Sequence, residues 1–205
     1  MRALLVLNGT CDEEFLVSSI RSHDILIGVD GGNEILVRLG FEPDVSIGDF
    51  DSFDPRNLKR SEILRFPSKK DEIDAELALK FCHERGFENV TVVCWMGERL
   101  DMIYALFGLM AGFPQNWVVL DSKKLRIGVV KEKAELEARN GELWSILPIG
   151  ERAVLSLRGF EYTLERSQMN IEKPYGVSNV ALTDRVEIEV HEGKVIYFRW
   201  MERPL

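Results

Sequence analysis

The sequence lacks any apolar run long enough to cross a membrane as a helix, and it is poor in cysteine. Cys11, Cys82 and Cys94 have no CxxC spacing, and their odd number leaves at least one unpaired. This pattern argues against a disulfide framework and is typical of a reducing cytoplasm. Residues 1–7 carry one charge and a short apolar run but lack the small-residue cleavage site of a signal peptide, so we interpret them as a first strand. These absences predict a cytoplasmic protein with no membrane partner.

Basic residues are outnumbered, because 26 lysines and arginines stand against 34 aspartates and glutamates and give a net charge of −8. An acidic chain is a poor partner for nucleic acid, since phosphate backbones are bound by basic surfaces. It can still bind a nucleotide when a divalent cation bridges carboxylates and phosphates. The composition therefore argues against nucleic acid as the partner and leaves nucleotides open.

The standard nucleotide and nucleophile motifs are also missing. The sequence contains no P-loop, no Gly-x-Gly-x-x-Gly and no Gly-x-Ser-x-Gly. His23, His83 and His191 lie far apart and lack the spacing of metal ligands. Nucleotide binding, if it occurs, therefore does not use a standard glycine loop.

What the chain does contain is a regular alternation of strand-like and helix-like stretches in its first two thirds. Thr10 and Glu13 have the spacing of a capping box and are expected to open the first helix. The expected strands are 3–7, 24–30, 45–47, 63–66, 90–95, 117–120 and 125–130, and further helices are expected at 33–39, 71–85 and 102–110. This alternation predicts an α/β N-terminal domain with a mainly parallel sheet flanked by helices.

The pattern changes after residue 131. Short strands are expected at 143–147, 153–157, 162–164, 185–190 and 195–200, joined by Gly-containing turns such as the hairpin turn 191–194. We predict a small antiparallel, β-sandwich-like C-terminal domain. The polar, mixed-charge stretch 131–135 is the expected boundary, so the predicted domains are 1–131 and 132–205.

The stretch 45–52 carries the strongest chemical signal. An apolar strand end is followed by Gly48, Asp49, Phe50 and Asp51, which places two carboxylates at the rim of a sheet. Open α/β sheets bind ligands at that rim, and paired carboxylates there suit Mg²⁺ and phosphate chemistry. Asp, Gly and Ser are also ordinary turn residues, so the motif alone leaves a simple turn open.

Further carboxylates follow the neighbouring strands, namely Asp30 after the second, Asp71 and Asp74 after the fourth, and Asp101 after the fifth. Consecutive parallel strands release their loops at one edge of a sheet, so these side chains are expected to converge on the Asp49–Asp51 pair. Each also has a structural alternative: a turn for the first, and capping of a helix N-terminus for the other three.

Two basic residues lie close to these carboxylates in the sequence. Arg99 has the forked guanidinium that binds phosphate, and Lys70 offers a second phosphate contact. The alternative for both is a solvated surface side chain. A phosphate ligand at this edge would agree with the predicted magnesium site.

Taken together, these motifs resemble the thiamine pyrophosphokinase (thiamine diphosphokinase) family over nearly the whole chain. The most specific similarity is the Gly-Asp-x-Asp-Ser element with its preceding Pro43-Asp44. The other similar elements are Asp30-Gly31-Gly32, Lys70-Asp71-Glu72-Ile73-Asp74, Gly97-Glu98-Arg99-Leu100-Asp101, 159–164 and Ser178-Asn179.

The resemblance implies an N-terminal catalytic domain that binds ATP and Mg²⁺, and a C-terminal domain for thiamine binding and dimerisation. It implies transfer of a pyrophosphoryl group from ATP to the thiamine hydroxyl, giving thiamine diphosphate and AMP. It also implies a homodimer whose active sites lie at the subunit interface.

The resemblance further implies residue roles, which fall into three groups. The expected metal ligands are Asp49, Asp51 and Asp74, and the expected ATP contacts are Lys70, Asp71 and Arg99. The catalytic set consists of the metal ligands together with Asp30 and Asp101, one of which would accept or orient the substrate hydroxyl proton. The expected thiamine contacts are Tyr162, Ser178 and Asn179.

Three positions depart from the family pattern, because Ile73 replaces a Thr, Glu98 a Gly and Met102 a His. Residues 122–127 also lack the Asn that often follows the strand-ending aspartate, here Asp121. Two alternatives therefore stay open: a catalytically weakened paralogue that binds thiamine diphosphate or a nucleotide, and a metal-dependent nucleotide-sugar transferase that uses Asp-x-Asp. A haloacid-dehalogenase-like phosphatase is disfavoured, since Phe53 stands where that class has Thr.

Overall fold

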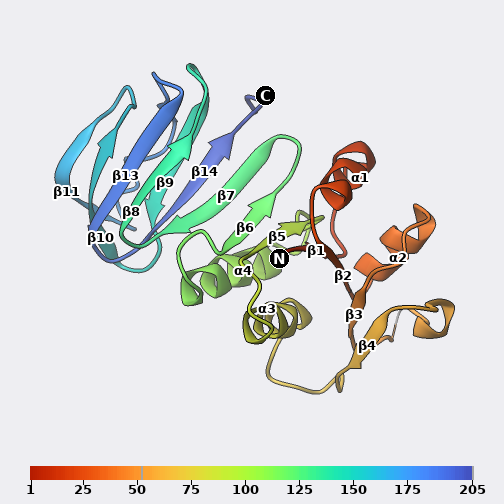
Figure 1. Cartoon of the computed structure of the whole chain (residues 1–205). Helices are drawn as coiled ribbons and strands as arrows, with labels where there is room; N and C mark the ends of the chain where they lie inside the picture. Colours follow the sequence, from red (N-terminus) through yellow and green to blue (C-terminus); the bar gives the residue numbers. More distant parts are fainter. Residues whose placement is uncertain (52, 205) are drawn as a thin grey trace. The chain divides into compact units, whose positions relative to one another are not determined.

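The computed structural model describes residues 1–51 and 53–204. Ser52, the last member of the Gly-Asp-x-Asp-Ser element, lies outside the described residues. The chain forms two compact units, Met1–Leu106 and Phe107–Leu205 (Figure 1). The first contains the acidic motifs and the second contains the predicted thiamine contacts.

A parallel sheet forms the centre of the first unit. Its strands lie in the order β5-β1-β2-β3-β4, and every neighbouring pair is parallel. Their bounds are β1 Arg2–Val6, β2 Ile25–Val29, β3 Val45–Gly48, β4 Glu62–Arg65 and β5 Asn89–Val93. The three central strands are almost continuously buried, as expected where helices cover both faces. The predicted parallel α/β sheet is confirmed.

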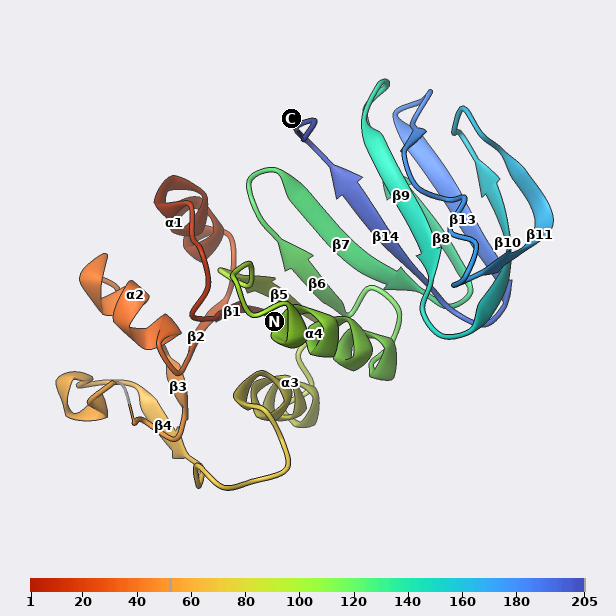
Figure 2. The same ribbon diagram turned by 180° about the vertical axis from the view of Figure 1, so that it is seen from behind.

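Helices cover the two faces of this sheet. They are α1 Glu13–Arg21, α2 Gly32–Arg38 and α3 Asp74–Glu84, with the 3-10 turn Pro55–Asn57 before β4. Leu16 of α1 and Leu36 of α2 pack in one core cluster with Leu4 and Leu26 of the sheet. Side chains alternate between the two faces of a strand. Buried Leu5 of β1 therefore points to the opposite face from Leu4, where Figures 1 and 2 show α3.

The starts of two helices differ from the predictions. The cap of α1 is Asp12, whose carboxylate accepts a hydrogen bond from Phe15 N at 2.9 Å, whereas Thr10 lies in a bridge to Met96. Helix α3 begins at Asp74 after an extended Ile73, so the alternative of Asp71 as its cap is wrong. The residues before α3 form a loop, and Asp74, the first residue of the helix, lies at the end of the sheet.

The second unit is built from two antiparallel sheets. One has the order β12-β9-β14-β7-β6 and the other β11-β10-β13-β8. The bounds of the first are β6 Val118–Asp121, β7 Leu125–Val130, β9 Leu143–Pro148, β12 Asn179–Val180 and β14 Val195–Trp200. Those of the second are β8 Lys133–Glu137, β10 Arg152–Arg158, β11 Leu164–Asn170 and β13 Arg185–Glu192. Helix α4, Leu100–Gly112, contributes residues to both units.

One core cluster draws on both of these sheets, so the second unit is a β-sandwich, as predicted. Fully buried Trp144 of β9 lies at its centre, 5.7 Å from the ring of Phe160 and 5.5 Å from that of Tyr197. The boundary between the two compact units lies between residues 106 and 107. Strand β7, which pairs along its length with β14, therefore belongs to the second unit. The predicted functional division after residue 131 stays a prediction.

Two stretches of the second unit differ in secondary structure from what the sequence suggested. The expected boundary 131–135 contains most of strand β8, whose polar side chains alternate with buried Ala134. Of the expected strand 162–164 only Leu164 lies in a strand, because β11 begins there and continues with the polar sequence LERSQMN. Strands β8 and β11 are the two edge strands of their sheet, and solvent-facing side chains in edge strands weaken the apolar alternation in the sequence.

The prediction that one cysteine is unpaired is confirmed for Cys82, but the argument against any disulfide is wrong. Cys11 and Cys94 form a disulfide across 83 residues of sequence, and Cys82 is buried and free. Strands β1 and β5 are adjacent and parallel, so residues just beyond their ends lie together. Sequence spacing carries no trace of this proximity.

No helix among the described residues is long and apolar enough to span a membrane.

The cap of α1 gives a direct test of the local structure. We expect Asp12→Ala to lower the free energy of unfolding by about 1 kcal/mol, because the amide of Phe15 loses its acceptor. Thr10→Ala is the matched control and should change it by less than about 0.5 kcal/mol. Denaturant unfolding followed by circular dichroism measures both. Equal effects of the two substitutions would contradict the assignment of the cap.

Candidate active site

Asp30 stands at the sharp turn between β2 and α2. Its backbone has a left-handed φ of 47°, and its N–H donates to Ile47 O at 2.9 Å. Asn33 fixes the turn, because its side-chain amide donates to Asp30 O at 2.9 Å and accepts from Ser46 Oγ at 2.7 Å. Asn33 is fully buried. The sequence prediction missed Asn33, although an Asn directly after Asp-Gly-Gly was a visible signal for such a clamp.

The carboxyl group of Asp30 lies against that of Asp74 at the start of α3. Its Oδ1 is buried without a hydrogen-bond donor among the described residues. Burial, followed by the adjacent Asp74 and then Asp49, raises the pKa of Asp30 to about 7. Lys70 Nζ lies 2.8 Å from Asp74 Oδ1, in an ion pair that is not a well-aligned hydrogen bond. The pair therefore holds more negative charge than the surrounding protein compensates.

The Asp49–Asp51 pair forms a tight turn after β3. Asp51 N donates to Asp49 Oδ1 at 3.1 Å, and Phe50 between them has a left-handed φ of 60°. The ring of Phe50 is buried under the guanidinium of Arg65, at 5.1 Å. The N–H of Asp51 and then the Ser68 side chain lower the pKa of Asp49, so this carboxylate is ionised at neutral pH. The Asp49–Asp51 stretch is therefore a turn, and the same turn presents two carboxylates to the pocket.

Arg99 and Asp101 form a forked pair at the start of α4. Arg99 Nε lies 2.9 Å from Asp101 Oδ1, and Nη2 lies 2.6 Å from Oδ2. The guanidinium holds the pKa of Asp101 low, at about 2. Asp101 is therefore an orienting partner for Arg99 and a poor acceptor of a proton.

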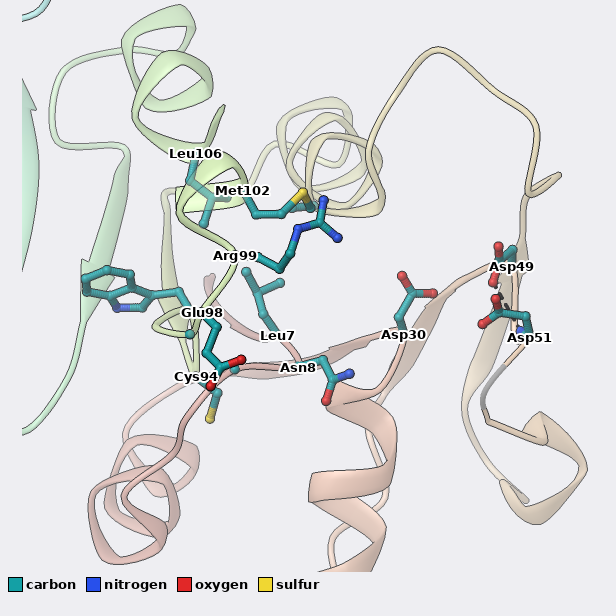
Figure 3. A pocket seen from close by; sticks show the side chains of 14 residues that line it. Leu7, Asn8, Asp30, Asp49, Asp51, Cys94, Glu98, Arg99, Met102 and Leu106 are labelled. Atoms are coloured by element: carbon teal, nitrogen blue, oxygen red, sulfur yellow. Dashed lines mark hydrogen bonds between the residues drawn. The ribbon is translucent and has the colours of Figure 1, made fainter. Parts of the chain in front are cut away.

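These elements surround one pocket in the first unit. A cavity of about 450 Å³ is lined by Asp30, Asp49, Asp51 and Arg99, and Figure 3 shows these side chains arranged around it. An adjoining hollow of about 310 Å³ is lined by Asp74 and Lys70, and it shares Asp30 and Asp49 with the first. The predicted convergence is therefore observed for six of the eight predicted residues of this unit: Asp30, Asp49, Asp51, Lys70, Asp74 and Arg99.

The other two predicted residues do not line this space. Asp71 and Asp101 are absent from the described walls of both hollows, and Asp101 pairs with Arg99. The three positions that depart from the family pattern do line it: Glu98 the larger cavity, Ile73 the smaller hollow and Met102 both.

The donor set of the pocket fits a hard cation. All its anionic ligands are carboxylates, and the buried Oδ1 of Asp30 needs a positive partner. Within the described chain, no three His, Cys, Asp or Glu side chains lie close enough to make a complete metal site. Mg²⁺ usually keeps several waters and is completed by substrate phosphates, so carboxylates that do not form a complete site by themselves suit it.

The predicted thiamine contacts gather in the second unit. Asn179 is buried, and its amide clamps the backbone of Tyr162, accepting from Tyr162 N at 3.0 Å and donating to Tyr162 O at 2.8 Å. The Tyr162 side chain is 64% exposed, and Ser178 has a left-handed φ of 62°. The structure thus makes Asn179 a residue that positions Tyr162.

Comparisons with known proteins agree with this geometry. The model of "Thiamin pyrophosphokinase, catalytic domain" matches residues 16–119, and that of "Thiamin pyrophosphokinase, vitamin B1 binding domain" matches residues 129–195. The chain is a two-domain protein of the thiamin pyrophosphokinase fold, and it belongs to the thiamin pyrophosphokinase family.

Individual relatives support the same assignment. The chain is 26% identical over 187 residues to a thiamine pyrophosphokinase of Bacillus subtilis, covering 86% of this chain and 87% of that protein. A crystal structure of thiamine pyrophosphokinase from Bacillus subtilis superposes with a TM-score of 0.84 at 21% identity, covering 99% of this chain and 100% of the other. Thiamin pyrophosphokinase from Candida albicans gives 0.79 at 17% identity, with 98% and 90% covered. These structures show that the fold is shared across bacteria and fungi.

Gly48 tests how tightly the site is packed. A Cβ at this position would lie 1.9 Å from Asp30 Oδ1, so we expect Gly48→Ala to displace Asp30 and to lower the free energy of unfolding by about 1 to 3 kcal/mol. Gly108→Ala is the control, because its Cβ would meet open space on a helix and should be neutral or stabilising. Denaturant unfolding compares the two variants. A Gly48→Ala protein as stable as the wild type would show that Asp30 is free to move.

Proposed function

We propose that this protein transfers a pyrophosphoryl group from ATP to the hydroxyl of thiamine, giving thiamine diphosphate and AMP. The observation that carries the proposal is the single pocket that gathers Asp30, Asp49, Asp51 and Arg99 at the carboxyl ends of parallel strands, in a member of this family. The proposal includes a cytoplasmic homodimer with its active sites at the subunit interface, in which the second unit binds thiamine through Tyr162.

Asp49 and Asp51, with Asp74, would hold Mg²⁺ against the phosphates of ATP. When bound, the cation neutralises charge on the phosphate oxygens and lets an anionic nucleotide enter an acidic pocket. The geometry supports this role for Asp49 in particular, because the backbone N–H of Asp51 keeps its carboxylate ionised. Asp74 would contribute from the start of α3, where it lines the same hollow as Asp49.

The cationic side chains would position the nucleotide. Asp101 holds Arg99 through Nε and Nη2, which leaves Nη1 available for a phosphate oxygen. Lys70 lies beside Asp74 and can exchange this ion pair for a contact with the phosphates. Asp71 would contribute from the loop before α3. Phosphoryl transfer depends mainly on such positioning and on charge neutralisation, which lower the barrier without covalent chemistry by the protein.

Asp30 is the best acceptor for the proton of the thiamine hydroxyl. Burial and Asp74 raise its pKa to about 7, whereas Arg99 holds the pKa of Asp101 near 2. A general base is most effective when its pKa is close to the working pH. Of the two aspartates that the sequence left open for this role, the electrostatics favour Asp30.

The metal-binding role is tested by single isosteric substitutions. We expect Asp49→Asn and Asp51→Asn each to lower thiamine-dependent release of AMP from ATP by about 100-fold or more, with the fold intact by circular dichroism. Asp54→Asn is the matched control, because this carboxylate lies a few residues away and pairs with Arg56 outside the pocket. Near-normal activity in either of the first two variants would overturn the assignment.

The role of Asp30 is tested by the pH dependence of kcat/KM. Below pH 7 its carboxyl is protonated and cannot accept a proton, so we expect kcat/KM to rise with pH through an apparent pKa of about 7. In Asp30→Asn this limb should be absent and the remaining activity low at every pH. An unchanged limb in the variant would assign the titration to another group.

A catalytically weakened paralogue that binds thiamine diphosphate or a nucleotide is the second candidate. The observation in its favour is that Ile73 and Met102 place apolar groups beside Asp30 in the pocket. Product analysis of ATP, Mg²⁺ and thiamine with the purified protein separates the candidates. Tight nucleotide binding by calorimetry with no AMP release in either Mg²⁺ or Mn²⁺ would favour the paralogue, and activity only with a sugar nucleotide would favour a transferase.

A further inference from the structure

Cys11 and Cys94 join two loops that form one wall of the pocket. Cys11 follows β1 and Cys94 follows β5, and their Cα atoms lie 4.6 Å apart in the disulfide. Cys94 itself lines the larger cavity, as do Asn8 and Gly9 of the first loop and Glu98 of the second. In the view of Figure 3, Cys94, Asn8 and Glu98 occupy the same part of the cavity.

The backbones of these loops are in close contact beside the sulfur atoms. Gly9 N donates to Cys94 O, and Thr10 N donates to Met96 O, each at 2.6 Å. A Cβ at Gly9 would lie 2.2 Å from Met96 O and 2.4 Å from Cys94 O, so no side chain fits between the loops. Cys94 also has a left-handed φ of 54°, which turns the chain at the end of β5. A covalent bond here fixes two segments whose backbone atoms contribute directly to the wall.

The two cysteine residues differ in exposure in the way that a stepwise exchange requires. Cys11 is partly exposed, and Cys94 is buried with 4% of its surface accessible. A small disulfide can therefore reach Cys11 first, and Cys94 is already in place to attack the mixed disulfide. Cys82 lies in the buried face of α3, where burial raises the pKa of its thiol to about 12, so it stays unreactive.

We propose that Cys11 and Cys94 form a reversible thiol–disulfide site, with a low-molecular-weight disulfide such as oxidised glutathione as its oxidant, and that the bond fixes this wall of the pocket. The Cys11 thiolate attacks one sulfur of the oxidant and releases the first glutathione thiolate. The Cys94 thiolate then attacks Cys11 Sγ and releases the second. Two protein thiols are oxidised to one disulfide, one glutathione disulfide is reduced to two thiols, and the two protein protons pass to the released thiolates.

The chemistry is tested by thiol titration and intact mass of the full-length protein. The fully reduced protein contains three thiols, and incubation with oxidised glutathione should leave only Cys82 free and make the chain lighter by two hydrogen atoms. Dithiothreitol should reverse the change. Cys82→Ala should behave like the wild type, whereas Cys11→Ser should form no internal disulfide. Persistence of three thiols in the oxidised wild type, or a bond that involves Cys82, would overturn the proposal.

The effect on the pocket is tested by hydrogen exchange of the oxidised and reduced states. We expect amides in 7–12 and 94–99 to exchange at least about 10-fold more slowly in the oxidised protein, because local opening of these loops then requires the joined segments to move together. Amides of α3 should not change, and Cys82→Ala should show the same difference between the states. Equal exchange of both loops in the two states would overturn the coupling to the wall. Neither measurement depends on ATP or thiamine, so a failure of the proposed enzymatic activity leaves both results interpretable.

Discussion

The structure of the site depends on the repulsion between carboxylates that the parallel sheet brings to one edge. Asp30 and Asp74 lie against each other, and Asp49 lies close enough to raise the pKa of Asp30 further. Lys70 offsets part of this charge. Like charges at this distance in a partly buried site destabilise the folded protein unless a proton, a cationic side chain or a metal ion compensates them. The same arrangement that costs stability would therefore favour the divalent cation of the proposed function.

Each of the neighbouring strand ends is shaped to present its carboxylate. Asn33 and Gly48 do this for Asp30, the first by holding its backbone and the second by leaving room for its carboxylate. The buried ring of Phe50 holds the turn that presents Asp49 and Asp51 on either side of it. In the second unit, the buried amide of Asn179 has the same function for Tyr162. Neighbouring buried residues thus determine where the side chains of the candidate sites lie.

The sequence predicted the parallel sheet, the β-sandwich and the convergence of the acidic residues, because strand order along the chain and apolar periodicity are local signals. It could not predict which aspartate has the raised pKa. That property depends on the contact between Asp30 and Asp74, which lie 44 positions apart in the chain (74 − 30 = 44). The Cys11–Cys94 bond was missed for the same reason. The capping alternative for Asp71 was wrong, because α3 begins three residues later, at Asp74.

Asp30, Phe50 and Cys94 share one unusual property, since each is a non-glycine residue with a left-handed backbone at the end of a strand of the same sheet. Such a conformation costs about 1 to 2 kcal/mol at a residue with a Cβ. This edge of the sheet therefore stores conformational strain that the well-packed strands behind it sustain. Substitutions that relax this edge are a natural route to a more heat-resistant protein, and the same route leads away from activity. Selection for thermal resistance and selection for turnover would thus act on the same three positions in opposite directions.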